Sequence, residues 1–419
     1  MKISNIWNDP DGNVQEMYDK WEEKVMEARK RNETVKKSNR KRKSKSMRKL
    51  MDEKKKLKAD KKPGDEDRIK KLNELKEKIL SEEHESYFRR LKRNCEEISK
   101  DGQFNSAGFW KLKKKMSRRK EVIHAVEDRD GNLITDNTKI INRYGEYFED
   151  LLTTTNRKTK MAENEKVVRD VEMKFEKMME EAMKQPAVKT EEALVTKTIK
   201  DLKKGKARDS QDWNNEMMKD GGLEIIKSIE KMADRVKETY EIPEQWNSMM
   251  IKSIDKQGKK EDLKNKRGLF LTNVVSKVFE KIQDQESTVT YDQFQNGGTR
   301  GRGTVDNWML VHALIDEGKR LNKPVYLFFG DLVKCFDRLW LKDCVVDLYE
   351  SGMRARDAGM IYKLNEKAVF KVITPAGETN PITVEEIVKQ GTVFGPKLCC
   401  ASTGKINSGL AEKEYCIHL

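Results

Sequence analysis

Asp331 is the residue whose type and position best suit chemistry. It follows an apolar run at residues 325–329 and one glycine. Such a run predicts a buried β-strand, and a carboxylate at the end of a strand lies at a sheet edge, where it can bind Mg²⁺ together with substrate phosphates. An aspartate that only caps the next helix is the other interpretation of the same residues. Asp331 is therefore a candidate catalytic and metal-binding residue.

Two glycine-containing segments could hold a nucleotide or a phosphate. Between a predicted strand and a predicted helix, Gln390 offers a hydrogen-bond donor and an acceptor, and Gly391 lets a base or sugar approach the main chain. Residues 293–304 form a glycine-rich loop with Arg300 and Arg302, a composition that can cradle phosphates. Taken singly, the first segment is also an ordinary strand-to-helix turn, and the second is a flexible surface loop.

The elements that would position these residues are mixed helices and strands. Residues 152–188 have the composition of a linker followed by an exposed helix. Strands interleaved with helices place the C-terminal half of the chain in the α+β class. Apolar spacing, capping residues and turn signals predict helices within 14–105, after a cap at Thr135 or Asp136, over 190–203, 222–240 and 269–282, from about Leu341 and after Gln390. They predict strands over 122–126, up to Ile254, over 325–329 and in a hairpin at 369–388.

The positive charge is concentrated in one segment. The formal net charge of the chain is +15, and residues 29–62 alone contain 18 Lys and Arg against 4 Asp and Glu. Such a segment is typical of a protein that binds a polyanion, because each neutralised phosphate releases condensed counterions. Its densest part is the candidate nucleic-acid contact Arg40, Lys41, Arg42 and Lys43. A nuclear import signal has the same composition, and a solvated helix face without a partner is the remaining alternative.

The cysteines, histidines and hydropathy argue against several other classes of protein. The six cysteines include no CxxC pair and the four histidines lie apart from them, so reduced thiols that pack in the interior are expected rather than a zinc site or disulfide framework. No apolar run reaches the length of a membrane span, and the first residues lack a signal peptide. We expect an intracellular, nuclear protein with no membrane partner.

The order of several segments resembles the reverse transcriptase of non-LTR retrotransposons. The resemblance covers about residues 105–410, and each segment alone is modestly specific, whereas their common order is strongly specific. The matching segments are residues 254–258, 265–282, 293–304, 329–331 and 390–391. Upstream of them, residues 109–151 are similar to the region before the polymerase, and residues 202–222 and 242–246 are similar to the start of its fingers.

The resemblance implies a role for each matching residue. Asp331 matches the first metal-binding aspartate of the palm, which holds Mg²⁺ against the incoming triphosphate. Phe336 matches the bulky residue that excludes a ribose 2′-hydroxyl. Arg267 matches the fingers arginine that grips the triphosphate, where its planar fork suits phosphate oxygens. Gln390 and Gly391 match the turn that positions template and nucleotide.

Some positions depart from the family pattern. Lys206 matches the start of a fingers motif and is a candidate nucleic-acid contact, but Arg208, Asp209, Gln211 and Asp212 follow where the family usually continues Pro-Gly-x-Asp-Gly. A glycine follows Arg267 where proline is usual, and the loop at 296–303 lacks the commoner Gly-Phe-Arg form. These departures affect the expected positioning of the template.

The resemblance also implies a domain organisation and a set of partners. Residues 1–105 would form a basic helical extension, 106–188 a connector with a strand-turn-helix and a linker, 189–323 a fingers-like region, and 324–419 a partial palm. The partners of the family are an RNA template, a DNA primer and an incoming dNTP, and its cofactor is Mg²⁺.

The second acidic motif of the family is absent. No Asp-Asp pair occurs in the sequence, and the acids after Gly391 are Glu412 and Glu414. Two-metal nucleotidyl transfer needs ions about 4 Å apart held by several carboxylates. We expect a truncated reverse transcriptase that binds nucleic acid without polymerising. The alternatives are a non-catalytic nucleic-acid-binding protein that uses the basic segment, and a helical scaffold in which the motif matches are accidental.

Overall fold

The computed structural model describes residues 2–32, 125–153, 165–289, 295–299, 301–332 and 335–411, with single residues between 71 and 96. The chain divides into two compact units, one formed by residues 1–30 with 123–419 and the other by residues 31–122. The first unit contains the sheet and is mixed α and β, which confirms the predicted class. Among the described residues, none of the helices combines the length and apolar character that a membrane span requires.

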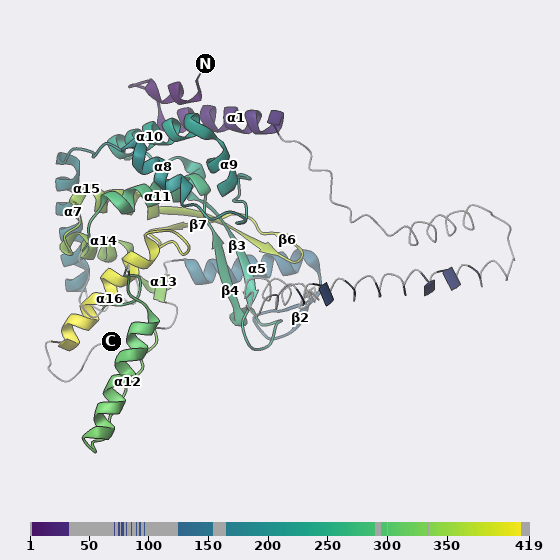
Figure 1. Cartoon of the computed structure of the whole chain (residues 1–419), viewed down its shortest axis with the longest axis vertical. Helices are drawn as coiled ribbons and strands as arrows, with labels where there is room; N and C mark the ends of the chain where they lie inside the picture. Colours follow the sequence, from purple (N-terminus) through teal and green to yellow (C-terminus); the bar gives the residue numbers. More distant parts are fainter. Residues whose placement is uncertain are drawn as a thin grey trace. The chain divides into compact units, whose positions relative to one another are not determined.

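A five-stranded sheet forms the β part of the first unit (Figure 1). The strands are ordered β4-β3-β5-β6, with β7 also paired to β5; β3 and β5 are parallel and the other pairs antiparallel. Ala368, Phe370 and Val372 of β5 are buried, because alternate residues of a strand point to one face. The strands are β3 (Ser248–Asp255), β4 (Lys266–Leu271), β5 (Lys367–Thr374), β6 (Gly377–Glu378) and β7 (Ile382–Glu385).

Helix α5 (Asn137–Leu152) packs on this sheet. It begins where the sequence predicts, because the Asp136 carboxylate accepts the Lys139 backbone N–H at 2.9 Å. Its apolar stripe, buried with the inner residues of β3 and β5, is Ile140, Tyr144, Phe148 and Leu152. Before α5, the strand expected at 122–126 is observed as β1 (Val126–Glu127), paired with β2 (Leu133–Ile134); residues 122–124 lie outside the described residues.

A second hydrophobic core forms among four helices. The prediction of an exposed helix within 152–188 is wrong for one face of α7, where Val171, Phe175, Met178 and Ala182 are buried. Steps of three and four residues place these side chains on one helical face, and α14 and α15 cover it. The helices are α7 (Glu165–Lys184), α14 (Leu341–Glu350), α15 (Ala355–Asn365) and α16 (Gly395–Ala411).

The N-terminal residues are part of the first unit, which differs from the boundary expected at residue 105. Trp21 of α1 is fully buried and stacks on Trp213 with 5.2 Å between ring centroids, while Tyr18 meets Trp246 edge-on at 6.3 Å. These aromatic contacts join α1 to a third core. Its elements are η1 (Ile3–Asn8), α1 (Val14–Asn32), α8 (Glu192–Lys200), α9 (Asn215–Asp220), α10 (Gly222–Thr239), η4 (Glu244–Asn247) and α11 (Val274–Glu286).

The helix expected at 269–282 begins later than predicted. Residues up to Leu271 belong to β4, and α11 starts at Val274 because the Asn273 side chain caps it by accepting the Ser276 backbone N–H at 2.9 Å. The apolar residues of β4 resemble the first turn of the helix in composition, so spacing alone did not separate the strand from the helix.

The strand expected at residues 325–329 is absent. Tyr326 is 89% exposed and Phe328 is 96% exposed, and the segment forms no ladder. Just before it, Lys323 closes the end of α12 (Thr304–Arg320) by donating its backbone N–H to the Gly318 carbonyl at 2.9 Å, and Val325 packs against Gly318. In the hairpin expected as its partner, β5 is already paired on both sides, with β3 on one and with β6 and β7 on the other, so the segment cannot pair with β5. The apolar composition of the segment is therefore not enough to make it a strand.

Asp347 of α14 is nearly fully buried and forms an ion pair with Lys405 of α16. Burial raises the pKa of its carboxyl to about 7. Because this folded-state pKa lies above the unfolded value near 4, the resulting stabilisation is complete below about pH 4 and is lost as the pH rises through about 7. We expect Asp347→Asn to be more stable than the parent at pH 8 by on the order of 3 kcal/mol.

Urea unfolding of the parent and Asp347→Asn at pH 5 and pH 8 measures this effect. The advantage of the variant should grow between the two pH values. Asp343→Asn, one turn earlier on α14, is the matched control because Asp343 also contacts Lys405 but is not buried. Equal stability differences at both pH values would contradict the assignment to Asp347.

Candidate functional site

The turn at Gln390 and Gly391 is packed against the main chain of β4. Gly391 has a φ of +84°, and a Cβ there would lie 3.0 Å from the Phe270 carbonyl oxygen. Both the conformation and this close approach require glycine. The Thr392 hydroxyl donates to the Lys389 carbonyl at 2.8 Å and accepts the Gly395 N–H at 3.1 Å, which closes the turn at the start of α16.

Two buried charged residues hold this turn in place through hydrogen bonds. Glu280 of α11 accepts the Val393 N–H at 2.7 Å, and burial raises the pKa of its carboxyl. Lys389 donates to Asn247 Oδ1 at 3.0 Å and to the Leu364 carbonyl, and burial lowers the pKa of its ammonium to about 8. The two opposite charges lie close enough to interact, so the turn is held between α11, η4 and α15.

The segment that follows Asp331 reaches the same place. A Cβ on Gly395 would lie 3.7 Å from the Phe336 ring, so this half-buried ring stands beside the first residue of α16. Phe336 belongs to the short helix α13 (Cys335–Arg338), which contacts α16. Phe336 and Gly391, both matched by the family resemblance, therefore lie at the two ends of one short turn, with Phe336 beside Gly395.

The glycine-rich loop also packs on α16. Gly298 has a φ of +73°, and a Cβ there would lie 2.6 Å from the Cys400 sulfur. The Cys400 thiol donates to the Gly297 carbonyl at 2.9 Å. Arg302 is exposed and donates to the Gln295 carbonyl, whereas Arg300 lies outside the described residues. Residues 295–299 are thus held against α16.

Arg267 is exposed on β4, opposite Ile254 of β3. It is three residues from Phe270, the residue that touches the turn, which corresponds to roughly 10 Å along a strand. Gly268, which departs from the family pattern, lies in a tight space, because a Cβ there would be 3.2 Å from Ile251 and 3.3 Å from Phe148. Arg267 is thus carried by the strand against which Gly391 packs.

The loop that contains Lys206 is anchored by Asp209. Its buried carboxylate accepts backbone N–H groups of Gln211 at 3.0 Å, Trp213 at 2.9 Å and Val274 at 2.8 Å. Burial raises the pKa of the carboxyl even though these three bonds lower it. Asp209 therefore joins the loop to the first residue of α11, and Lys206 is exposed on it.

The same loop meets the start of the basic segment. The Asp212 carboxylate accepts from Arg29 and from Arg208, each at 2.7 Å, and these cations lower its pKa. The Trp213 indole N–H donates to Glu22 of α1 at 2.7 Å. Asp212, one of the residues that replace the family pattern in this loop, therefore binds α1, a role that its sequence context does not indicate.

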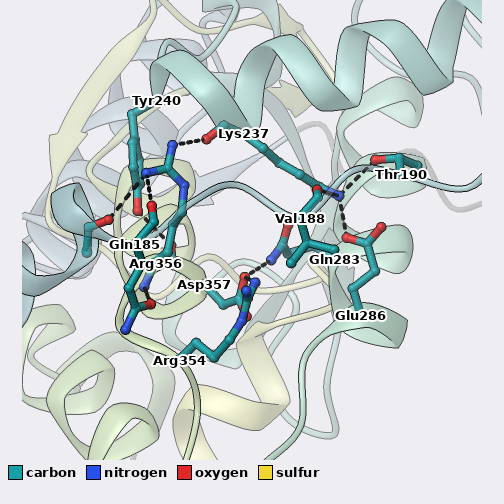
Figure 2. Close-up of polar contacts among 11 residues, drawn as sticks. Gln185, Val188, Thr190, Lys237, Tyr240, Gln283, Glu286, Arg354, Arg356 and Asp357 are labelled. Carbon is teal, nitrogen blue, oxygen red and sulfur yellow. Dashed lines mark hydrogen bonds and ion pairs between the residues drawn. The ribbon is translucent and has the colours of Figure 1, made fainter.

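Figure 2 shows a network of polar contacts that fixes the other half of α11. Lys237 of α10 donates to the Thr190 hydroxyl at 2.8 Å and forms a buried ion pair with Glu286 of α11. One turn earlier, Gln283 donates to the Asp357 carboxylate of α15 at 2.8 Å. Because Glu280 lies on this helix, the network determines where Glu280 meets the turn.

Arg356 of α15 extends the network to the end of α7 (Figure 2). It donates to the carbonyls of Gln185 at 2.8 Å and Lys237 at 2.6 Å. Its guanidinium lies 4.9 Å from the centroid of the Tyr240 ring, and the Tyr240 hydroxyl donates to the Arg356 carbonyl at 2.7 Å. Burial raises the pKa of Tyr240 to about 12. The donors of Arg356 are thus used to hold helix ends together.

Asp331 does not belong to a metal centre within the described residues. It is exposed in the segment after α12, and no group of three or more His, Cys, Asp or Glu side chains in the described part of the chain could hold a metal ion. Mg²⁺ requires near-octahedral oxygen ligands, which one exposed carboxylate does not supply. The described residues therefore do not fit the Mg²⁺ that the family resemblance implies.

The remaining predicted contacts lie elsewhere. Arg40, Lys41, Arg42 and Lys43 are outside the described residues, as is most of the basic segment. Glu280 and Lys389 were not recognised as parts of the site. The signal that could have identified these two residues is a charged side chain inside an otherwise apolar helix or strand pattern, since charged residues are rarely buried without a partner.

No protein-family model matches this sequence, and no curated protein matches it either.

Proposed function

We propose that this chain binds nucleic acid through a reverse-transcriptase-like core and does not carry out nucleotidyl transfer as the 419-residue polypeptide. An RNA template and a DNA primer are the proposed partners, contacted through their phosphates by the basic segment and by exposed cations such as Arg267, Lys206 and Arg302. In the family it resembles, a dNTP and Mg²⁺ complete the site.

The observation that carries the proposal is the meeting of distant segments at the start of α16. Residues 295–299, Phe336 and the turn at Gly391 all lie against or beside this helix, and β4, which bears Arg267, touches the turn. These segments span more than 90 positions, and they are the ones whose order resembles the polymerase. Their proximity favours a common site over the accidental matches of a helical scaffold.

The second half of the proposal, binding without synthesis, rests on the carboxylates. The sequence has no Asp-Asp pair, and Asp331 is exposed outside any described metal-holding group. Two-metal transfer requires carboxylates that hold both ions. A non-catalytic nucleic-acid-binding protein needs only the cations, which this chain has in excess.

Binding and synthesis can be measured on the same full-length protein. Fluorescence anisotropy of a labelled RNA–DNA primer-template should show binding that weakens steeply with salt, and primer extension with dNTPs and Mg²⁺ should give no product. Arg267→Gln should weaken binding and flatten the salt slope by about 1, as expected for the loss of one phosphate contact.

Lys177→Gln, which removes an exposed charge from α7, is the matched control and should leave the salt slope unchanged. Product in the extension assay would refute the claim of inactivity. Failure of the full chain to bind the primer-template at low salt would refute the proposed function as a whole.

A further inference from the structure

Four of the six cysteines are described, and they gather around the first turns of α16. Cys399 and Cys400 lie on α16, Cys335 on α13 and Cys344 on α14, and all four are reduced. The sulfurs of Cys335 and Cys399 are 3.4 Å apart, although the two residues are 64 positions apart in the chain. From the sequence, these thiols are expected only to pack in the interior.

The four thiols differ in accessibility. Cys344 is fully buried and Cys400 is buried with its thiol bonded to the Gly297 carbonyl. Cys335 and Cys399 are half-buried, so a small solute can reach them. Burial and the neighbouring Cys335 thiol raise the pKa of Cys399 to about 12, which keeps that residue protonated near neutral pH. Cys335 and Cys399 are therefore the pair open to a small oxidant, whereas Cys344 and Cys400 are enclosed.

We propose that Cys335 and Cys399 form a thiol-oxidation site that a small peroxide converts to a disulfide. The Cys335 sulfur attacks one peroxide oxygen, the O–O bond breaks, and Cys335 becomes a sulfenic acid as hydrogen peroxide is reduced to water. The Cys399 sulfur then attacks the sulfenic sulfur, the S–S bond forms, and the hydroxyl leaves as a second water with the thiol proton. Two thiols and one hydrogen peroxide thus give one disulfide and two waters.

The short distance between the Cys335 and Cys399 sulfurs favours a disulfide between these two cysteines over any other pair. A disulfide bond is about 2.05 Å long, so the two sulfurs must approach by little more than 1 Å. The bond would tie α13 to α16 beside Phe336 and Gly395. It would also close a loop of 64 residues, which restricts the unfolded chain and stabilises the folded one. The proposal depends on these contacts and not on the proposed function.

Peptide mapping of the full-length protein tests the proposal. Reduced protein is treated with hydrogen peroxide, free thiols are alkylated, and the protein is digested with trypsin without reductant. Cleavage after Lys334, Arg338, Lys397 and Lys405 places Cys335 in one short peptide and Cys399 with Cys400 in another. We expect these two peptides to be joined, with a loss of about 2 Da that a reductant reverses.

Three serine variants identify the partner. Cys400→Ser should still give the joined peptides, whereas Cys335→Ser and Cys399→Ser should not. The oxidised parent should also melt higher than the reduced parent by on the order of 5 °C, a shift that Cys399→Ser should lack. Joined peptides in Cys399→Ser but not in Cys400→Ser, or full alkylation of Cys335 after peroxide treatment of the parent, would overturn the proposal.

Discussion

Replacing every Lys and Arg between residues 36 and 62 by Gln is expected to lower the affinity of the chain for an RNA–DNA primer-template roughly a thousand-fold at 50 mM salt. This change removes fifteen positive charges and keeps the chain length. It leaves Arg29 in place, so the contact of Arg29 with Asp212 and the packing of α1 are retained. The loss should therefore report on phosphate contacts rather than on folding.

The salt dependence distinguishes this segment from the rest of the protein. If the segment contacts at least six phosphates, the slope of log K against log salt should flatten by about 5. Fluorescence anisotropy between 50 and 300 mM salt measures both quantities. Lys166, Lys177 and Lys184, exposed on α7, are changed to Gln in the control, which should keep nearly the parent slope. An unchanged slope in the fifteen-residue variant would exclude the basic segment as the nucleic-acid contact.

Phe370→Ala is expected to destabilise the first unit by about 3–5 kcal/mol, the usual range for a large aromatic side chain removed from a core. Phe370 is fully buried on β5, whose neighbours on both sides are strands of the same sheet. Its ring meets that of Phe270 nearly perpendicularly at 5.7 Å between centroids. The substitution thus leaves a cavity and removes an aromatic contact at the strand that supports the Gly391 turn.

Phe328→Ala is the matched comparison, because it removes the same atoms from a side chain that is 96% exposed. Its effect on the free energy of unfolding should stay within about 0.5 kcal/mol. Urea unfolding of both variants, followed by circular dichroism, measures the difference. A large loss in Phe328→Ala would mean that residues 325–329 form the buried strand that the sequence predicts.

Elements with a local signal could be predicted from the sequence. The cap at Asp136 and the apolar stripe after it determine α5, and a turn between two alternating runs determines the hairpin of β5 and β7. In the site, the irregular backbone expected at Gly391 between a strand and a helix is observed, with a positive φ and a close backbone contact that only glycine allows. These features depend on residues near one another in the chain, where spacing carries the information.

The charge distribution was also determined by sequence alone, because it is a sum over residues and needs no fold. The excess of cations in residues 29–62 and the lack of an Asp-Asp pair decide which partners and chemistry are proposed. The packing of Trp21 on Trp213, by contrast, joins residues about 190 positions apart, and neither residue signals the other.

The tertiary structure alone decided the exposure of Phe328, the buried position of Glu280 under the turn and the contact between Cys335 and Cys399. Each of these three features depends on which contacts are made between residues far apart in the chain. An apolar run becomes a strand only where it finds a pairing partner, and here β5 is already paired on both sides, with β3 and with β7. A short pattern states what a segment prefers, whereas long-range packing determines which of the competing contacts is made.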